Sequence, residues 1–245
     1  MKYFVLIMIF IFTACAKESA LHRGTPEAEL DRCVELSKKT KYEETVECLE
    51  IVKSHYPNSS TAQQAELRIG DIYFQEKEFL LAAESYVSFI QLYPRSPQID
   101  YAYYRAGVAY FRESPKAIDR DQQHLDDAIH NLETVVNYYP QSTYRELAGR
   151  FLSEARRRIA RHHYYVGRFY YRTGEYIAAL PRLREVAVNF TDSGLAPRAL
   201  YLMTIANIKL KQFDEAKKVF GALSVEYPKN KWTVKAEKKL LKAVH

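Results

Sequence analysis

The chain has 245 residues and a formal net charge of +6, which allows one domain or two small ones with a sizeable core. Its hydrophobic content of 47% is ordinary for a globular protein. Beyond the first residues, no segment is long and apolar enough to cross a bilayer. Tyrosine is unusually frequent, with 20 residues against 12 Phe and 1 Trp, so we expect tyrosine rings both in helix interfaces and on binding surfaces.

Residues 1–14 have the pattern of a signal peptide. The apolar run Tyr3–Phe12 follows a positive residue and is too short to span a bilayer. The small residues before Cys15 resemble the bacterial lipobox. That resemblance implies acylation of Cys15, a lipid anchor on the periplasmic face of the outer membrane and a flexible tether over residues 15–26. The alternative is an ordinary signal peptide that is cut nearby.

Two further cysteines, Cys33 and Cys48, follow the tether. An exported protein lies in an oxidising compartment, so a disulfide between them is one reading. The other reading, which the spacing favours, is a pair of buried thiols.

A periodic pattern runs through the rest of the chain. Tyr-Pro pairs recur at Tyr56-Pro57, Tyr93-Pro94, Tyr139-Pro140 and Tyr227-Pro228, and Phe190-Thr191 takes the same place in a further copy. Upstream of each pair lies a bulky residue: Tyr42, Phe79, Leu125, Tyr176 and Phe213. A small residue follows three positions later, and another bulky one, such as Tyr86 or Leu183, follows four after that. Nine residues before the first anchor lies a further small residue in most copies, such as Gly70 or Gly167, and Gly107 fills that role in the third copy.

This register matches the tetratricopeptide repeat, in which small residues lie where two antiparallel helices touch. Such hairpins must stack on one another to bury their apolar faces. We therefore predict an all-α superhelix of about five helical hairpins with a concave groove, closed by an amphipathic helix over Lys231–Val244.

Two copies depart from the regular repeat. In the third, Phe111–His124 is inserted between the helices. In the fourth, the first helix extends backwards, which predicts one helix of roughly 30 residues over Thr143–Tyr176, capped by Ser142 or Thr143 and ended by Gly174.

The charge changes sign at the start of this long helix: residues 16–140 carry a net charge of −7 and residues 141–245 a net charge of +12. We interpret residues 27–142 as the acidic repeats 1–3, and residues 143–245 as a basic half with the long helix, repeats 4–5 and a C-terminal cap, so the two halves have different partners. The family resemblance described below implies that the first half faces substrate and the second a partner protein. The alternative is a solvated surface of uneven charge.

No motif indicates catalysis. The segment Asp119–His124 lacks a full set of metal ligands, and we expect Asp121 to be the N-cap of the next helix. The neighbouring His162 and His163 point in different directions on a helix. We therefore expect no enzyme activity, no metal and no cofactor.

Two groups of side chains are candidates for binding. The arginines of the long helix, with Arg156, Arg157, Arg161 and Arg172 foremost, suit a protein partner or lipid headgroups better than nucleic acid, because the protein is exported; a merely solvated face is the alternative. Tyrosines Tyr73, Tyr101, Tyr104 and Tyr110 are candidates to line the groove, where an extended apolar or aromatic peptide would bind.

Together these features resemble the BamD family of outer-membrane lipoproteins of the β-barrel assembly machinery. The matching segments are Asp100–Gly107, Asp119–His124, Tyr139–Tyr144, Tyr170-Tyr171 and Gly174–Ala179. The resemblance implies that the N-terminal repeats bind unfolded outer-membrane proteins through their C-terminal strand. It also implies that the C-terminal repeats, including Arg198, dock on the periplasmic domains of the barrel subunit BamA, alongside other lipoproteins of the machinery. The alternative function is a structural lipoprotein that links envelope complexes such as Tol–Pal or the peptidoglycan machinery.

Overall fold

The computed structural model describes residues 24–38 and 41–244. The predicted signal peptide, the lipidation residue Cys15 and most of the predicted tether lie outside the described residues.

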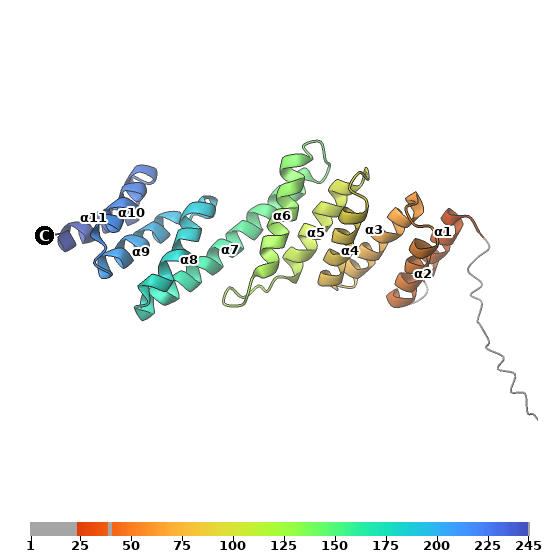
Figure 1. Cartoon of the computed structure of the whole chain (residues 1–245), viewed down its shortest axis with the longest axis horizontal. Coiled ribbons are helices and arrows are strands. Elements are labelled where there is room, and N and C mark those ends of the chain that lie inside the picture. Colours follow the sequence, from red (N-terminus) through yellow and green to blue (C-terminus); the bar gives the residue numbers. More distant parts are fainter. Residues whose placement is uncertain (1–23, 39–40, 245) are drawn as a thin grey trace, which may run out of the picture.

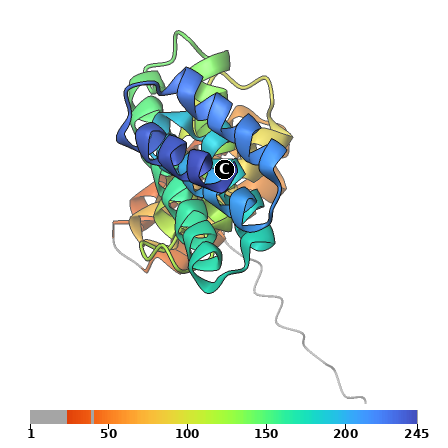
Figure 2. The same cartoon turned by 90° about the vertical axis from the view of Figure 1, so that its left-hand side faces the viewer.

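Eleven α-helices and one short 3₁₀ helix make up this described part. They are α1 (Pro26–Leu36), α2 (Tyr42–His55), α3 (Ser60–Gln75), α4 (Phe79–Leu92), α5 (Ile99–Glu113), α6 (Gln123–Tyr138), α7 (Arg145–Thr173), α8 (Tyr176–Asn189), η1 (Thr191–Ser193), α9 (Ala196–Lys209), α10 (Phe213–Glu226) and α11 (Lys231–Val244). Figure 1 shows them as an elongated row of hairpins, and Figure 2 views the row from the end that carries α11. Each helix packs on its neighbours in sequence, which confirms the prediction of five hairpins and a closing helix.

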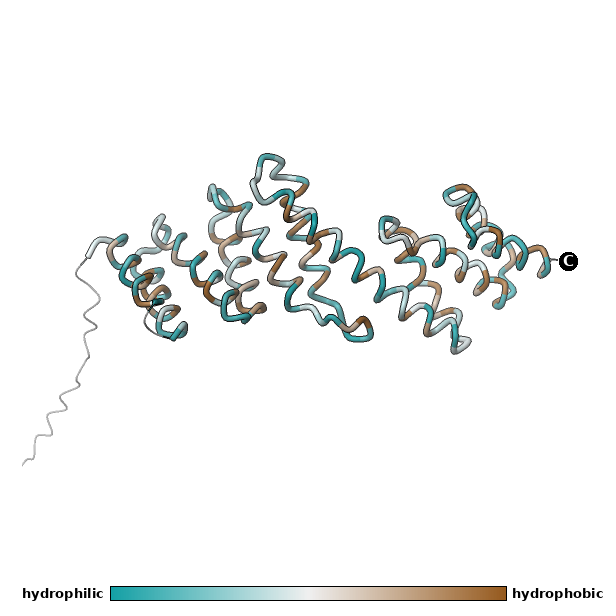
Figure 3. Tube along the Cα trace, turned by 180° about the vertical axis from the view of Figure 1, so that it is seen from behind, coloured by the Kyte–Doolittle hydropathy of each residue, from teal (hydrophilic) through white to brown (hydrophobic). Residues whose placement is uncertain are grey.

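The small residues of the repeat let paired helices approach closely. A Cβ atom added to Gly107 would lie 2.6 Å from Cγ of Leu132, and one added to Gly70 would lie 2.8 Å from Cε1 of Tyr86. Leu132 and Tyr86 are the bulky residues of the same repeats, and both are fully buried. Apolar segments (brown in Figure 3) accordingly recur on every hairpin along the row.

The Tyr-Pro pairs, and Phe190-Thr191 in the fourth hairpin, end the second helix of each hairpin. Tyr56, Tyr93, Tyr139, Phe190 and Tyr227 are the C-caps, with φ between −120° and −133°. A proline that follows such a residue cannot continue the helix, because it lacks the N–H donor.

Replacing Gly107 by Ala should lower the free energy of unfolding by about 1–3 kcal/mol, because the new methyl group overpacks the contact with Leu132. Gly149 in α7 is the control, since a Cβ atom there meets nothing within 4 Å. Gly149→Ala should raise the stability by about 0.5–1 kcal/mol through helix propensity alone. Urea denaturation of both variants tests this, and equal effects would contradict the packing argument.

The long helix is present and spans 29 residues, but it starts later than predicted. Its N-cap is Tyr144, not Ser142 or Thr143, and no side chain caps it. Ser142 instead lies in the preceding turn, where its hydroxyl accepts a hydrogen bond from the Tyr144 N–H at 3.1 Å. The predicted end is confirmed, because Gly174 adopts a left-handed conformation with φ of 88° that suits glycine.

The insertion of the third repeat is shorter than predicted, since α5 and α6 extend into it and leave residues 114–122 as the loop. The prediction that Asp121 caps α6 is wrong. The N-cap is Gln122, a buried residue whose side-chain amide donates to the carbonyl oxygens of Pro115, Ala117 and Arg120 at 3.0–3.2 Å. Gln122 therefore organises the loop that precedes the helix.

Cys33 and Cys48 form a disulfide, so the favoured reading of two buried thiols is wrong. The bridge joins α1 to α2 with 5.6 Å between the Cα atoms. Cys33 occupies the position at which later repeats have a small residue, such as Gly70 or Gly167.

Candidate functional site

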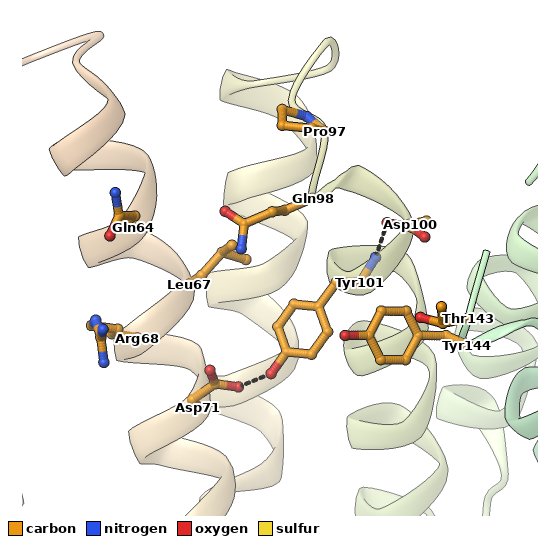
Figure 4. A pocket seen from close by; sticks show the side chains of 10 residues that line it. All are labelled: Gln64, Leu67, Arg68, Asp71, Pro97, Gln98, Asp100, Tyr101, Thr143 and Tyr144. Carbon is orange, nitrogen blue, oxygen red and sulfur yellow. Dashed lines mark hydrogen bonds between the residues drawn. The ribbon is translucent and has the colours of Figure 1, made fainter.

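Two hollows on the N-terminal repeats meet at α3. The larger has a volume of about 580 Å³ and lies between α3, the start of α5 and the turn before α7 (Figure 4). The smaller, of about 260 Å³, lies between α1, α2 and α3. Arg68 and Asp71 line both hollows, so we treat them as one surface, the N-terminal groove.

Asp71 accepts hydrogen bonds from two tyrosines at the floor of this groove. The hydroxyls of Tyr86 and Tyr101 each donate to Oδ1 of Asp71 at 2.5 Å, and Figure 4 shows the bond from Tyr101. Arg105 completes the cluster: its Nη2 lies 3.2 Å from the same oxygen, and its Nε donates to the Tyr86 hydroxyl at 2.9 Å. The Asp71 network thus joins α3, α4 and α5.

Both tyrosines remain protonated and can donate. Burial, followed by the hydrogen bond to Asp71, raises the pKa of Tyr101. Burial and then the negative charge of Asp71 raise the pKa of Tyr86. The guanidinium of Arg105 lies 4.0 Å from the ring centre of Phe74, so a cation–π contact fixes it as well.

A row of aromatic rings connects the Asp71 network to α7. Tyr144 lies 5.2 Å from Tyr101 and stacks on Tyr104 at 5.2 Å between ring centres. Tyr104 in turn lies 6.4 Å from Phe151. The rings attach the start of α7 to α5 and close one end of the groove.

Of the four tyrosines predicted to line a groove, the structure places Tyr101 there. Tyr104 stacks on Tyr144, Tyr73 packs edge-on against Tyr42, and Tyr110 stacks on His124. Contact of any of the four with a ligand stays a prediction.

The sequence analysis missed the polar residues of the groove, above all Gln64, Arg68 and Gln98. A signal for two of them was present. Gln64, Arg68 and Asp71 recur at intervals of four and three, which is one face of a helix. Their polar character sets that face apart from the buried faces of α3.

Arg156 is bound within the chain. Its guanidinium donates to Asp192 at 3.0 Å, to the carbonyl oxygen of Asn189 at 2.7 Å and to Glu133 at 3.2 Å. It therefore joins α6 and the α8–η1 turn across α7, and a role in binding a partner stays a prediction.

Arg158 is likewise an internal tie. Its guanidinium donates to the carbonyl oxygens of Phe111, Ser114 and Pro115 at 2.6–3.3 Å, and it lies 4.8 Å from the ring centre of Phe111. Together with Gln122 it holds the insertion loop against α7.

The other arginines of α7 face outward. Arg157 forms an ion pair with Glu154 at 2.7 Å. Arg161, Arg168 and Arg172 are exposed, and so are Tyr165 (43%) and Phe169 (56%) between them. These five residues, Arg161, Tyr165, Arg168, Phe169 and Arg172, follow helical spacing and form the α7 stripe. Arg198 lies on α9, where it stacks over Tyr164 and Trp232 at 5.1 and 5.3 Å.

Within residues 24–38 and 41–244, no group of three or more His, Cys, Asp or Glu side chains could hold a metal ion. In the same part of the chain, no helix is long and apolar enough to cross a membrane. The arrangement offers surfaces for binding.

Residues 31–219 match the family model YfiO, which is described as an outer membrane lipoprotein. The match covers well over half of the chain. The chain belongs to this family.

Curated relatives from three bacteria share the name outer membrane protein assembly factor BamD. The protein of Caulobacter vibrioides is 27% identical over 80% of this chain and 64% of its own length. That of Rickettsia prowazekii is 27% identical over 79% of this chain and 77% of its own. That of Pasteurella multocida is 24% identical over 96% of this chain and 93% of its own. The chain thus spans just under two thirds of the first of these relatives.

Solved structures that are similar include a thermophilic TPR protein from Thermus thermophilus, with 15% identity, a TM-score of 0.36 and coverage of 90% of this chain and 99% of that one. The TPR2AB domain of yeast Sti1 has 14% identity and a TM-score of 0.41, and covers 89% of this chain and 84% of that one.

Proposed function

We propose that this protein is a non-enzymatic assembly factor for outer-membrane β-barrel proteins, held at the periplasmic face of the outer membrane by an acyl group on Cys15. The observation that carries the proposal is the N-terminal groove on a chain of this family. The names of the BamD relatives support the same role.

The chemistry of the groove suits an extended, unfolded segment. The side-chain amides of Gln64 and Gln98 can pair with both N–H and C=O groups of a peptide backbone. The rings of Tyr101 and Tyr144 offer apolar surface to its side chains. Arg68, exposed where the two hollows meet, suits a carboxylate such as a chain terminus.

The α7 stripe suits a second, folded partner, which we propose to be the periplasmic domains of BamA. Exposed aromatic rings between exposed arginines are typical of protein interfaces. The net charge of +12 over residues 141–245 favours an acidic partner surface.

Binding of a peptide with the sequence of the last strand of an outer-membrane β-barrel tests the groove. Arg68→Glu should weaken the affinity at least tenfold, because it places a like charge beside the peptide carboxylate. The matched control is Arg95→Glu, which makes the same charge change in the exposed turn after α4, outside the groove. Equal affinity of both variants would show that the peptide binds elsewhere.

Binding of purified BamA periplasmic domains tests the stripe separately. The double variant Arg161→Glu/Arg172→Glu should bind at least tenfold more weakly, with a larger difference at low salt. The control Arg95→Glu/Arg184→Glu changes the charge equally on exposed positions away from the stripe. Co-purification with Tol–Pal or cell-wall proteins instead of a barrel subunit would show that the protein links envelope complexes and is not an assembly factor.

A further inference from the structure

The last helix, α11, is covered on one side only. Thr233, Ala236 and Leu240 are buried, where α11 packs on α9 and α10. Figure 2 shows α11 at the end of the row, with no helix beyond it. Within the described residues, the opposite face of α11 is exposed.

That open face is a stripe of lysines. Its members are Lys231, Lys235, Lys238, Lys239 and Lys242. At 100° per residue they fall within an arc of about 100° around the helix axis. The single acid of α11, Glu237, lies outside this arc, and within the described part of the chain none of the five lysines forms an ion pair with a carboxylate. Like charges on one helix face repel one another. A negatively charged partner would relieve that repulsion.

Four of the lysines border a hollow together with one aromatic residue. Tyr201 of α9 and four of the lysines line a volume of about 460 Å³. Trp232 lies beside it, 5.1 Å from Tyr201 between ring centres, and Nζ of Lys235 lies 4.8 Å from the centre of the indole. On the other flank of the stripe, Val234 and Leu241 are 61% and 57% exposed.

We propose that this α11 lysine stripe binds the headgroups of an anionic phospholipid surface. Lysine is a flexible point charge that suits a diffuse array of phosphates, whereas recognition of a particular carboxylate favours arginine with its fixed fork of donors. The exposed Val234 and Leu241 and the neighbouring Trp232 suit the boundary between headgroups and acyl chains. The proposal is independent of the peptide groove and of the α7 stripe, and it would stand if either of those failed.

Trp232 reports on this contact directly, because it is the only tryptophan of the chain. The full-length protein is mixed with vesicles that carry spin-labelled phospholipid headgroups, made either of phosphatidylcholine alone or of phosphatidylcholine with phosphatidylglycerol. We expect strong quenching of Trp232 emission by the anionic vesicles, which declines as salt is raised. Quenching of the same extent in neutral vesicles would overturn the proposal, since the acyl anchor alone would then account for it.

A matched pair of variants separates the stripe from general charge. Each lysine contributes about fivefold in affinity. The variant Lys235→Gln/Lys238→Gln/Lys239→Gln/Lys242→Gln should therefore raise the vesicle concentration for half-maximal quenching by about 600-fold. The control removes the same charge near the α9–α10 turn, in the variant Lys209→Gln/Lys211→Gln/Lys217→Gln/Lys218→Gln. It should leave the vesicle concentration for half-maximal quenching unchanged. Equal losses in both variants would contradict the proposal.

A soluble acidic probe distinguishes a lipid surface from a protein partner. If polyglutamate shifts the Trp232 emission while anionic vesicles do not quench it, the stripe binds an acidic protein and the lipid proposal is wrong. Two results together support the lipid surface. Vesicles still quench Trp232 in the presence of polyglutamate, and inorganic phosphate reduces this quenching no more than chloride does at equal ionic strength.

Discussion

Replacing Asp71 by Ala should lower the free energy of unfolding by about 2–4 kcal/mol. The carboxylate accepts from Tyr86, Tyr101 and Arg105, and its loss leaves two hydroxyls and a largely buried cation without their acceptor. Hydrogen bonds to charged groups contribute about 1.5–3 kcal/mol each, and breaking a buried pair on one side costs about 3–5 kcal/mol. Because the Asp71 side chain is 31% exposed, water compensates part of this loss.

Urea denaturation measures the total effect, and hydrogen exchange locates it. We expect loss of protection in α3, α4 and α5, the three helices that the network joins. Tyr101→Phe removes one donor and should cost about 1 kcal/mol. Asp214→Ala is the control, since this carboxylate is fully exposed in the first turn of α10, and we expect a loss of no more than about 1 kcal/mol. A loss for Asp71→Ala no larger than that for Tyr101→Phe would mean that the network contributes little to stability.

Opening the disulfide between Cys33 and Cys48 should cost about 3 kcal/mol, the value for a closed loop of about 15 residues in the chain-entropy model. The loss should be confined to α1 and α2. A terminal repeat has a neighbour on one side only, so it can unfold while the rest of the row persists.

Hydrogen exchange of α1 and α2, with and without reductant, is the direct measurement because it changes no residue. The double variant Cys33→Ala/Cys48→Ala should behave like the reduced protein in either condition, apart from a small packing loss. Ala avoids the hydroxyl that Ser would place at Cys33, a fully buried position. Equal protection of α1 in oxidised and reduced protein would contradict this prediction.

The repeat pattern was sufficient to predict the hairpins because it records contacts that recur. A glycine at this position lies against the bulky residue of its repeat in three hairpins, at Gly70, Gly107 and Gly167, so their spacing carries the geometry. The end of α7 at Gly174 was predictable for a similar reason, since a left-handed residue there favours glycine.

Features that occur only once in the chain were harder to predict. Ser142 and Asp121 have the chemistry of helix caps. Yet the Ser142 hydroxyl accepts from the Tyr144 N–H in the turn before α7, and the side chain of Gln122 organises the loop before α6. Arg156 and Arg158 have the pattern of an outward basic run, but their partners lie 23–47 residues away in the sequence. Only the packing of the helices brings those partners close.

The bridge in the first hairpin also changes how a pull on the N-terminal end would travel along the row. A load that enters at Pro26 crosses from Cys33 to Cys48 through the covalent bond and bypasses residues 34–47. Those residues amount to about 50 Å of extended chain at roughly 3.3–3.6 Å per residue. While the bridge is closed, the load does not extend that length of chain. The first repeat therefore lengthens much less under tension than the hairpins that follow it.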